Sequence, residues 1–594
     1  MTPFVFSRGR LVPLATTAGC LLALTAPEAA RGQFSLTTNN NLVTITGYSG
    51  PGGAVTIPAW VGTLPVVAID DYAFNGASGI TSLTTSTNLA SIGNSSFQGC
   101  GGLQTVTLAP GLASLGSSAF ASCGSLGSVA LPATVTNVAA GAFAGCTGLS
   151  GITVDPANPA YASQGGVLFS ADATLLVTYP GGMAGAYTIP ATVTAVADDA
   201  FEFCGHLTSI TIPSSVASLG QWSLAFCTAL TNATLSPNLV AIPNGAFDGC
   251  SALPTLAIPT GTTNIGSSAF SFCSSLASVT FPPDVNTIGA RAFADCGALT
   301  SVTVPEGMVN LGSFAFTSCS NLSAASLPST LTNIGTSPFS SCGRLAAINI
   351  APANPAYSSV GGVLFDSAQT TLFECPPAKT GTFTIPNTVK VISTNAFDGC
   401  SLLTGVVFGN QVLTIGNYAF NGCSGLTRLV LPASLTNVAT AAFEDCSGIT
   451  TAYAPAGLAS IGDFAFSGCS ALTGFFFAGN PPASGQQLFL GNGKGTVYYF
   501  AGSSNWPATF GGLPTALWNP TVPAHSPTFG VRTNEFGFTI SGPTNLTVVV
   551  EVATNLLGPV WVPVGTNVLS GGSSYFNDPG WASRPRGFYR FSTP

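Results

Sequence analysis

Cysteine is the residue whose spacing most strongly suggests chemistry in this chain. Of its 16 cysteines, fourteen recur in register, most of them 23 residues apart, as Cys100 and Cys123 are. An even number of cysteines in an exported chain ordinarily indicates disulfides. If each step is one coil of a stack, however, equivalent cysteines lie about 4.8 Å apart with parallel Cα–Cβ bonds, whereas a disulfide needs the two sulfurs turned toward each other. We therefore expect a column of buried free thiols, with an occasional oxidised neighbouring pair as the alternative, and a solitary, reactive thiol at the out-of-register Cys375.

Side chains suited to catalysis are scarce. Only two histidines occur, His206 and His525, and the sequence contains no Gly-x-Ser-x-Gly, no Walker loop and no His-Glu-x-x-His. The paired acids Asp70-Asp71 and Asp198-Asp199 each precede an Ala-Phe pair, so we expect them to stabilise turns. No His stands close enough to the recurring cysteines to complete a tetrahedral metal site. We therefore predict no catalytic residue, no metal site and no cofactor.

The recurring cysteines belong to a longer repeated stretch. Its clearest copy, residues 265–282, reads IGSSAFSFCSSLASVTFP, and variants of it return from Asp70 to Leu472. At Cys227 the aromatic slot three residues earlier holds Leu224, and the first copy has Ala77 in place of cysteine, which makes fifteen copies. The other copies carry phenylalanine in that slot: Phe74, Phe97, Phe120, Phe143, Phe201, Phe247, Phe270, Phe293, Phe316, Phe339, Phe397, Phe420, Phe443 and Phe466.

Each copy predicts two short strands and a turn. From Leu276 to Pro282 apolar and polar residues alternate with period two and end at a proline, which is typical of a strand. The Ile-Gly and Ala-Phe positions are too few and too close to glycine for a helix, so we expect a second short strand and a tight or single 3₁₀ turn. Leu-x-x-Val-x-Leu/Ile at this period is the leucine-rich-repeat pattern. The predicted fold is an all-β leucine-rich-repeat solenoid of about fifteen 23-residue coils, followed by a small C-terminal β-sandwich.

The repeat pattern also divides the chain into segments. Two gaps of 58 residues hold related insertions near 155–189 and 351–385, which begin DPANPAYASQGGVLF and APANPAYSSVGGVLF and predict projecting β-hairpins. We expect the remaining segments in this order: a signal peptide at 1–32, an N-terminal cap at 33–69, the repeats at 70–473, a C-terminal cap at 474–519, a linker at 520–527 and the sandwich at 528–594.

Charge and hydropathy exclude two classes of protein. Arg8 and Arg10 precede an apolar stretch from Leu11 to Leu24, which is typical of a secretory leader. Removing residues 1–32 takes three of 13 basic and one of 21 acidic residues, leaving 10 against 20. Such a chain lacks the basic surface that a nucleic-acid binder needs. Beyond the leader no apolar run reaches the 18 or so residues of a membrane span.

The wording of the repeat, Ile-Gly-x-x-Ala-Phe-x-x-Cys-x-x-Leu, resembles the BspA-like bacterial leucine-rich repeats over about residues 40–500, and the NPAY-xS-xxGVLF insertions are similar to those of that family. The resemblance implies a secreted or surface-attached protein that binds other molecules or cells. It implies neither a ligand nor a catalytic residue. The last 70 or so residues resemble β-sandwich modules at the ends of secreted bacterial proteins, which implies a role in sorting or attachment.

The outward strand positions are the remaining source of a candidate site. Two and four residues after the repeat Leu, side chains point away from the core, as Ser278 and Thr280 do. Most such pairs are Ser or Thr, which β-propensity alone explains. The last four coils differ, and we predict that four of their outward residues bind a ligand: Arg428, Val430, Tyr453 and Phe476. The alternative is that these aromatics pack under the C-terminal cap or a folded-back sandwich.

We therefore expect a secreted or cell-surface protein without catalytic activity. The favoured function is adhesion or recognition by a monomer, with an extracellular protein or a glycan on another cell or matrix as partner. A polysaccharide-acting enzyme with an unrecognised site and a purely structural surface-layer component are the alternatives.

Overall fold

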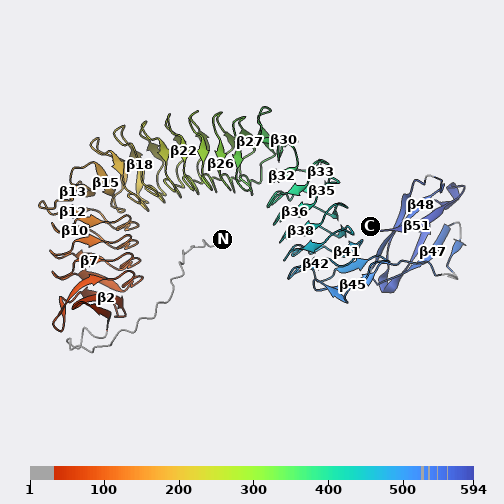
Figure 1. Cartoon of the computed structure of the whole chain (residues 1–594), viewed down its shortest axis with the longest axis horizontal. Coiled ribbons are helices and arrows are strands. Elements are labelled where there is room, and N and C mark those ends of the chain that lie inside the picture. Colours follow the sequence, from red (N-terminus) through yellow and green to blue (C-terminus); the bar gives the residue numbers. More distant parts are fainter. Residues whose placement is uncertain (1–32, 524–527, 533–534, 545, 558, 594) are drawn as a thin grey trace. The chain divides into compact units, whose positions relative to one another are not determined.

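The computed structural model describes residues 33–523, 528–532, 535–544, 546–557 and 559–593. It divides into two compact units, one ending at Gly165 and the other beginning at Gly166. Each contains short strands and turns stacked coil upon coil (Figure 1). Within the described ranges, helix is limited to the 3₁₀ turns η1 (Ser570–Gly572) and η2 (Trp581–Ser583). The all-β prediction is confirmed, and the expected signal peptide at 1–32 lies outside the described residues.

The Leu-x-x-Val segments form a first ladder of parallel strands, in which Ser278 stands opposite Thr255 of the preceding coil. Val302 is buried between the exposed Ser301 and Thr303, as period-two alternation requires. In the first unit the strands of this ladder are β3 (Gly53–Thr56), β6 (Ile80–Thr84), β8 (Thr105–Thr107), β10 (Val129–Leu131) and β12 (Ile152–Val154). In the second unit they are β16 (Gly185–Thr188), β18 (Leu207–Thr211), β19 (Asn232–Thr234), β21 (Thr255–Ala257), β23 (Ser278–Thr280), β25 (Ser301–Thr303), β27 (Ala324–Leu327), β29 (Ala347–Ile350), β33 (Gly381–Thr384), β35 (Leu403–Val407), β37 (Arg428–Val430), β39 (Thr451–Ala454), β41 (Gly474–Phe477), β43 (Thr496–Tyr499) and β45 (Leu513–Leu517).

The residues before each Ile-Gly glycine form a second parallel ladder of mostly two-residue strands. Ile265 pairs with Ile242 and Ile288 of the adjoining coils, and all three are fully buried. The first unit contributes β5 (Leu64–Ile69), β7 (Ser91–Ile92), β9 (Ser114–Leu115) and β11 (Asn137–Val138). The second contributes β15 (Leu175–Thr178), β17 (Ala195–Val196), β20 (Ala241–Ile242), β22 (Asn264–Ile265), β24 (Thr287–Ile288), β26 (Asn310–Leu311), β28 (Asn333–Ile334), β32 (Thr371–Glu374), β34 (Val391–Ile392), β36 (Thr414–Ile415), β38 (Asn437–Val438), β40 (Ser460–Ile461) and β42 (Ala483–Ser484).

The Ala-Phe segment is a turn whose hydrogen bonds join each coil to the next. The N–H groups of Ser268, Phe270 and Phe272 donate to carbonyl groups of the following coil, at residues 290, 292 and 294. The N–H groups of residues 269, 271 and 273 donate within their own coil. Every N–H from 268 to 273 is therefore paired, which explains how a turn without regular secondary structure can lie against the core.

Phenylalanine fills the centre of each coil. The rings of Phe247, Phe270 and Phe293 stack with centroid separations of 5.4 and 5.1 Å, and all three side chains are fully buried. Leu224 occupies the same slot, because it is fully buried and its N–H donates to Ala246 as Phe247 N–H donates to Ala269. The predicted register is confirmed at this irregular coil.

The cysteines form the predicted column of buried thiols, and the fifteen described cysteines are free. Each ladder thiol also makes a hydrogen bond that the sequence does not reveal. Cys273 Sγ donates to the carbonyl oxygen of Phe247 at 3.2 Å, and Cys296 Sγ donates to that of Phe270 at 3.2 Å. Burial raises the pKa of both thiols well above the ordinary value. Both thiols therefore stay protonated, and their hydrogen bonds tie neighbouring turns together.

The insertions form the predicted antiparallel hairpins, but the hairpins are built into the stack and do not project. In the second, β30 (Tyr357–Val360), β31 (Val363–Asp366) and β32 pair antiparallel, and β32 then joins β34 in the second ladder. Val363, Leu364 and Phe365 are fully buried. In the described part of the first insertion that belongs to the second unit, β14 (Val167–Ser170) pairs with β15, which joins β17. Three successive apolar residues are buried here because the insertion completes a further coil.

Cys375 is not solitary, contrary to the sequence-based expectation, and it is buried. Its side chain is 1% exposed, and its N–H donates to Ala396 as Phe397 N–H donates to Ala419. Cys375 therefore occupies the aromatic slot of the insertion's own coil. Cys400 Sγ in turn lies 3.6 Å from the carbonyl oxygen of Cys375 and donates to it.

Additional strands cover the ends of the stack. At the start, β1 (Phe34–Asn39) pairs antiparallel with β2 (Leu42–Tyr48), β2 pairs parallel with β5, and β4 (Trp60–Val61) pairs antiparallel with β5. At the other end, β41, β43 and β45 continue the first ladder in parallel, and β44 (Thr509–Phe510) turns back against β45. The segments expected to be caps are thus themselves partly coils of the solenoid.

The C-terminal residues form two three-stranded sheets. One contains β46 (Gly530–Arg532), β47 (Glu535–Ser541) and β50 (Ser573–Asp578), and the other contains β49 (Val562–Val568), β48 (Thr547–Ala553) and β51 (Phe588–Ser592). Ile540, Val548 and Val550 are fully buried in one shared core. Within the expected linker, Thr521 N–H donates to the Ser541 carbonyl at 2.8 Å, so this residue is fixed to the module.

Candidate interaction surfaces

Among the described residues, no three or more His, Cys, Asp or Glu side chains lie together in a way that could hold a metal ion. Asp71 Oδ1 accepts the backbone N–H of Asn94 at 2.6 Å, and Asp198 Oδ1 accepts that of Gln221 at 2.7 Å, each from the next coil. The turn-stabilising role predicted for the acid pairs is confirmed. His206 is exposed, and His525 lies outside the described residues.

The strand face carries the uncharged strip expected from the sequence. Ser278, Thr280, Ser301 and Thr303 are exposed, with the intervening valines directed into the core. The strip offers hydroxyl groups without charge, aromatic rings or a pocket, and β-propensity explains its composition. This face therefore supplies no specific feature for ligand recognition.

The four residues predicted to bind a ligand do not form one open surface. Arg428 and Val430 are exposed, whereas Tyr453 is half-buried and Phe476 is only 2% exposed. The rings of Tyr453, Phe476 and Tyr498 stack at 4.9 and 5.0 Å, and Arg428 Cζ lies 4.9 Å from the Tyr453 centroid. Phe476 and Tyr498 share a hydrophobic cluster with buried residues of the C-terminal module: Phe538, Ile540, Leu546, Val548, Val550, Leu569 and Phe576.

This placement matches the alternative left open above, in which the sandwich folds back over the aromatics. An outward strand position says only that a side chain points away from its own coil. Whether a distant segment covers that position depends on contacts between residues more than 50 apart in sequence, which a repeat pattern cannot reveal. The exposed part of the predicted site is thus limited to Arg428 and Val430.

A second group of aromatic residues, missed in the sequence, lies on the turns. We call Phe203, Trp222, Phe226 and Phe272 the turn-face ridge. Phe203 and Phe272 are 40% and 55% exposed, and the rings of Phe203 and Phe226 stack at 4.7 Å. All four residues have left-handed φ values between 56° and 59°, which are unfavourable for bulky side chains. The equivalent turn residue in the next coil after Phe226 is Gly249, with φ of 70°.

The sequence does contain a signal for the ridge. The residue before the repeat cysteine is glycine in several coils, including Gly399, Gly422 and Gly468, because the backbone there is left-handed. Phe203, Phe226 and Phe272 place an aromatic ring at this position. An aromatic residue at a position where other copies carry glycine therefore indicates the ridge, once the backbone at that position is known to be left-handed.

Carboxyl groups lie on the same turns as the ridge. Burial, with a further contribution from Asp198, raises the pKa of Asp199 to about 6. Burial also raises the pKa of Glu202 to about 7, assisted by the charges of Asp199 and Asp248. For Asp248, burial outweighs a hydrogen bond from Ser271 and raises the pKa to about 6. Glu202 is therefore repelled by both other acids, and the three carboxyl groups favour either protons or a cationic neighbour.

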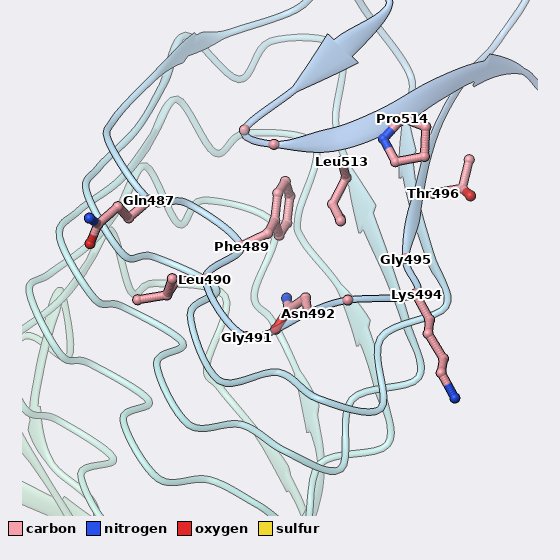
Figure 2. A pocket seen from close by; sticks show the side chains of 13 residues that line it. Gln487, Phe489, Leu490, Gly491, Asn492, Lys494, Gly495, Thr496, Leu513 and Pro514 are labelled. Atoms are coloured by element: carbon pink, nitrogen blue, oxygen red, sulfur yellow. The ribbon is translucent and has the colours of Figure 1, made fainter.

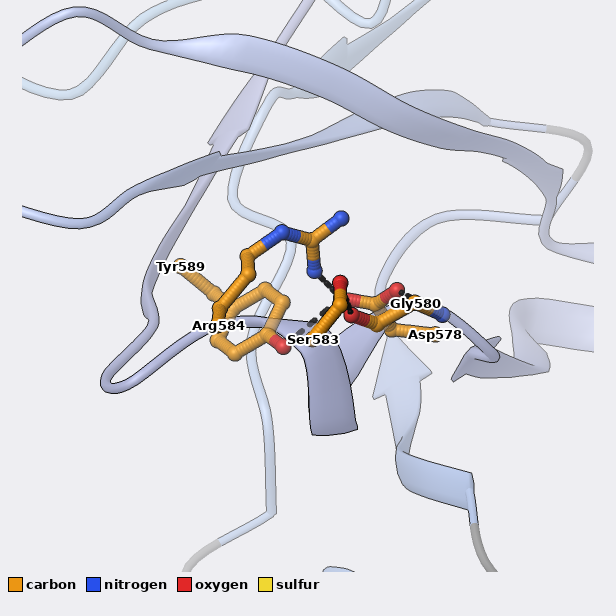
Figure 3. A network of polar contacts seen from close by, with 5 residues as sticks. All are labelled: Asp578, Gly580, Ser583, Arg584 and Tyr589. Carbon is orange, nitrogen blue, oxygen red and sulfur yellow. Dashed lines mark hydrogen bonds and ion pairs between the residues drawn. The ribbon is translucent and has the colours of Figure 1, made fainter.

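The C-terminal module contains a separate buried polar network (Figure 3). Asp578, 2% exposed, forms an ion pair with Arg584, accepts the Tyr589 hydroxyl at 2.8 Å and accepts the Gly580 N–H at 2.9 Å. Burial and the Asp578 charge raise the pKa of Tyr589 to about 12. Because every group here already has a partner within the module, the network fixes the β50–β51 connection.

The described residues contain no helix long and apolar enough to cross a membrane.

No curated protein shows significant similarity to the sequence. Among solved structures, the chain is similar to a leucine-rich-repeat protein from Bacteroides ovatus, at 21% identity over 75% of this chain and 93% of that one, with a TM-score of 0.35. A leucine-rich cell surface protein from Faecalibacterium prausnitzii matches at 23% identity over 75% and 93%, with a TM-score of 0.36. The pneumococcal vaccine antigen PcpA matches at 15% identity over 78% and 85%, with a TM-score of 0.30.

At these identities and TM-scores the likeness says nothing about ligand or activity. The family comparison is stronger, because it rests on the repeat sequence itself. The model of the BspA type leucine rich repeat region matches in six copies over residues 66–164, 185–270, 240–370 and 366–493, which together are more than half of the chain. The repeated coil with its buried phenylalanine and thiol columns therefore places the chain in the BspA-type leucine-rich-repeat family.

Proposed function

We propose that this protein acts outside the cell as a non-catalytic recognition protein, and that its turn-face ridge binds an extracellular protein partner. Family membership and the leader-like residues 1–32 support an extracellular location. The observation that carries the choice of surface is the ridge itself: two exposed and two half-buried aromatic side chains at left-handed backbone positions that glycine occupies in other coils. Strain retained at an exposed position is a reason to infer a functional role there.

The arrangement of the rings favours a protein over a glycan. A sugar binds best to an open aromatic face, but Phe226 lies face to face with Phe203 on one side. On the other side its ring is so close to Gly249 that an added Cβ would lie 2.5 Å from Cδ1. Phe226 therefore presents mainly its ring edge, which suits the apolar core of a protein interface, where aromatic residues dominate the binding energy.

The acids beside the ridge indicate the character of the partner. Burial raises the pKa values of Asp199, Glu202 and Asp248, and for Glu202 repulsion by the other two carboxylates adds to the shift. A Lys or Arg side chain placed among them would relieve that repulsion and release protons. We therefore propose a partner surface that combines apolar residues with basic ones.

The experiment is a binding screen of the mature protein on an array of extracellular proteins and glycans. Phe226→Gly/Phe272→Gly removes ridge rings while installing the residue that other coils carry at this turn position. Ser278→Ala/Thr280→Ala is the matched control, because it changes the strand face of the Phe272 coil. We expect the control to retain a protein partner that the ridge variant loses. Retention by both variants excludes the ridge, and hydrolysis of an arrayed glycan favours the enzymatic alternative.

A further inference from the structure

The last turn of the solenoid ends in a row of backbone donors that have no acceptor among the described residues. In the preceding coil, the N–H groups of Phe464, Phe466 and Gly468 donate to the carbonyl groups of residues 486, 488 and 490. The equivalent N–H groups of the next coil belong to Gln487, Phe489 and Gly491, and no described residue accepts from them. By continuation of the ladder, all three point in the direction in which a further coil would lie.

A pocket occupies the place of that missing coil (Figure 2). It has a volume of about 610 Å³ and is lined by residues 487 and 489–496 of the last turn and by residues 511–514 of the β44–β45 connection. Gly511 packs so closely against Leu488 and Phe489 that an added Cβ would lie 2.9 Å from each. The connection therefore covers the apolar end of the core and leaves the row of N–H groups facing the pocket.

Asn492 adds one fixed acceptor to this row of donors. It stands in the cysteine slot, and its Nδ2 donates to the Phe466 carbonyl at 2.9 Å, as a ladder thiol does. That bond identifies the amide nitrogen and so also the position of the amide oxygen. The oxygen, Oδ1, is buried without a hydrogen-bond partner among the described residues, in a side chain that is only 3% exposed. A buried polar atom without a partner is costly, so Oδ1 is suited to accept from a ligand donor.

Another place in the chain shows which chemical group can accept hydrogen bonds from such backbone N–H groups. At the second insertion the following coil is irregular, and the N–H of Phe339 donates to Oε1 of Glu374 at 3.0 Å instead of to a backbone carbonyl. Phe339 and Phe489 occupy the same slot of their coils. At this interruption of the ladder, a side-chain carboxyl group therefore takes the place of the backbone acceptor. At the C-terminal pocket the equivalent donor is the N–H of Phe489, and no Asp or Glu of the chain lines the pocket to accept from it.

Charge in the pocket also favours an anion. The exposed Lys494 lines it and forms no ion pair with any described residue, and its lining residues include no Asp or Glu. Successive backbone N–H groups that converge on one side form an anion-binding surface.

We infer that this pocket binds a carboxylate that has a hydrogen-bond donor beside it, with the row of backbone N–H groups and Lys494 holding the carboxylate and Asn492 Oδ1 accepting from the neighbouring donor. An α-acylamino acid, as at the C-terminus of a peptide, and an α-hydroxy acid both have this chemistry. The site is separate from the turn-face ridge, so either proposal can fail without the other.

Equilibrium dialysis of the mature protein with isotope-labelled small probes tests the inference. N-acetylglycine carries the carboxylate and the donor, acetate lacks the donor, and N-acetylglycinamide lacks the carboxylate. We expect N-acetylglycine to bind about tenfold or more tightly than acetate, because one additional buried hydrogen bond forms, and the amide not to bind. Glycolate and glucuronate then distinguish an α-acylamino acid from hydroxy acids as the source of the carboxylate.

Two variants locate the binding. Gly493→Trp fills the pocket mouth, since a Cβ at Gly493 has no neighbour within 4 Å; Gly343→Trp, after Cys342 in an earlier coil and equally open, is its matched control. We expect Gly493→Trp alone to abolish N-acetylglycine binding. Asn492→Cys restores the ladder residue, removes the acceptor and should bring N-acetylglycine down to the affinity of acetate. Equal binding of the acid and the amide, or undiminished binding to Gly493→Trp, overturns the inference.

Discussion

Replacing Glu374 by Gln should make the solenoid less sensitive to alkaline pH. The Glu374 side chain is 2% exposed, its Oε1 accepts the Phe339 N–H, and its Oε2 is buried without a partner among the described residues. Burial raises the pKa of this carboxyl from the ordinary 4.5 to about 8, although the Phe339 hydrogen bond opposes the shift. Gln retains an acceptor for Phe339 and cannot titrate.

The sign and size of the effect follow from linkage between protonation and folding. Because the folded pKa is the higher one, the protonated carboxyl stabilises the fold at low pH, and this contribution is lost as pH rises from about 4.5 through about 8. Since one pKa unit corresponds to about 1.4 kcal/mol, the shift amounts to at most about 5 kcal/mol. The parent should therefore lose up to about 5 kcal/mol of local stability between pH 5 and 9 that Glu374→Gln keeps.

Urea unfolding at a series of pH values measures this difference, because other titrating groups such as Glu202 are common to both proteins. Hydrogen exchange of the peptides around Phe339 reports the same difference locally, which is useful because a repeat array need not unfold in one step. Glu306→Gln, at an exposed glutamate, is the control and should behave as the parent. Identical pH profiles for the parent and Glu374→Gln would refute the reasoning.

The other predictions concern the core and the ridge. Phe270→Ala should cost about 3–5 kcal/mol locally, because a fully buried ring is removed between two stacked neighbours; an unchanged urea midpoint would contradict this. The fifteen described cysteines should not react with a thiol reagent in the folded protein, and they should react once the protein is unfolded in the absence of reductant. A number of reactive thiols near zero in the unfolded protein would indicate disulfides. Phe272→Gly should leave stability unchanged or raise it by about 1 kcal/mol, since glycine accepts the left-handed backbone; a loss of several kcal/mol in thermal unfolding would show that the ring packs. Binding of the ridge partner should strengthen between pH 5 and 8 as Glu202, with its pKa raised to about 7, loses its proton, and Glu202→Gln should remove that dependence.

The repeat made the interior of the solenoid predictable. A fixed step places equivalent residues in one column, so Phe270 and Cys273 could be assigned to the core from spacing alone, and Leu224 could be identified in the aromatic slot of an irregular coil. Periodicity works here because each coil buries its apolar residues only against its neighbours.

Features that break the repeat were harder to predict. Cys375 looked solitary because the length of the insertion conceals its place in the aromatic slot. Phe476 looked exposed because its cover comes from the C-terminal module, more than 50 residues later. The ridge was missed because the left-handed φ at Phe226 and Phe272 is set by the turn and cannot be inferred from the residue type. These features depend on contacts or dihedral angles that no sequence period encodes.

The most direct test of the proposed recognition function is the affinity of the array-selected protein partner for three forms of the mature chain, measured by surface plasmon resonance. Phe226→Gly/Phe272→Gly should weaken binding by at least about 30-fold, the loss expected when aromatic residues at the centre of an interface are removed. Ser278→Ala/Thr280→Ala should bind as the parent does. Equal affinities of the parent and the ridge variant, with both correctly folded, would contradict the account.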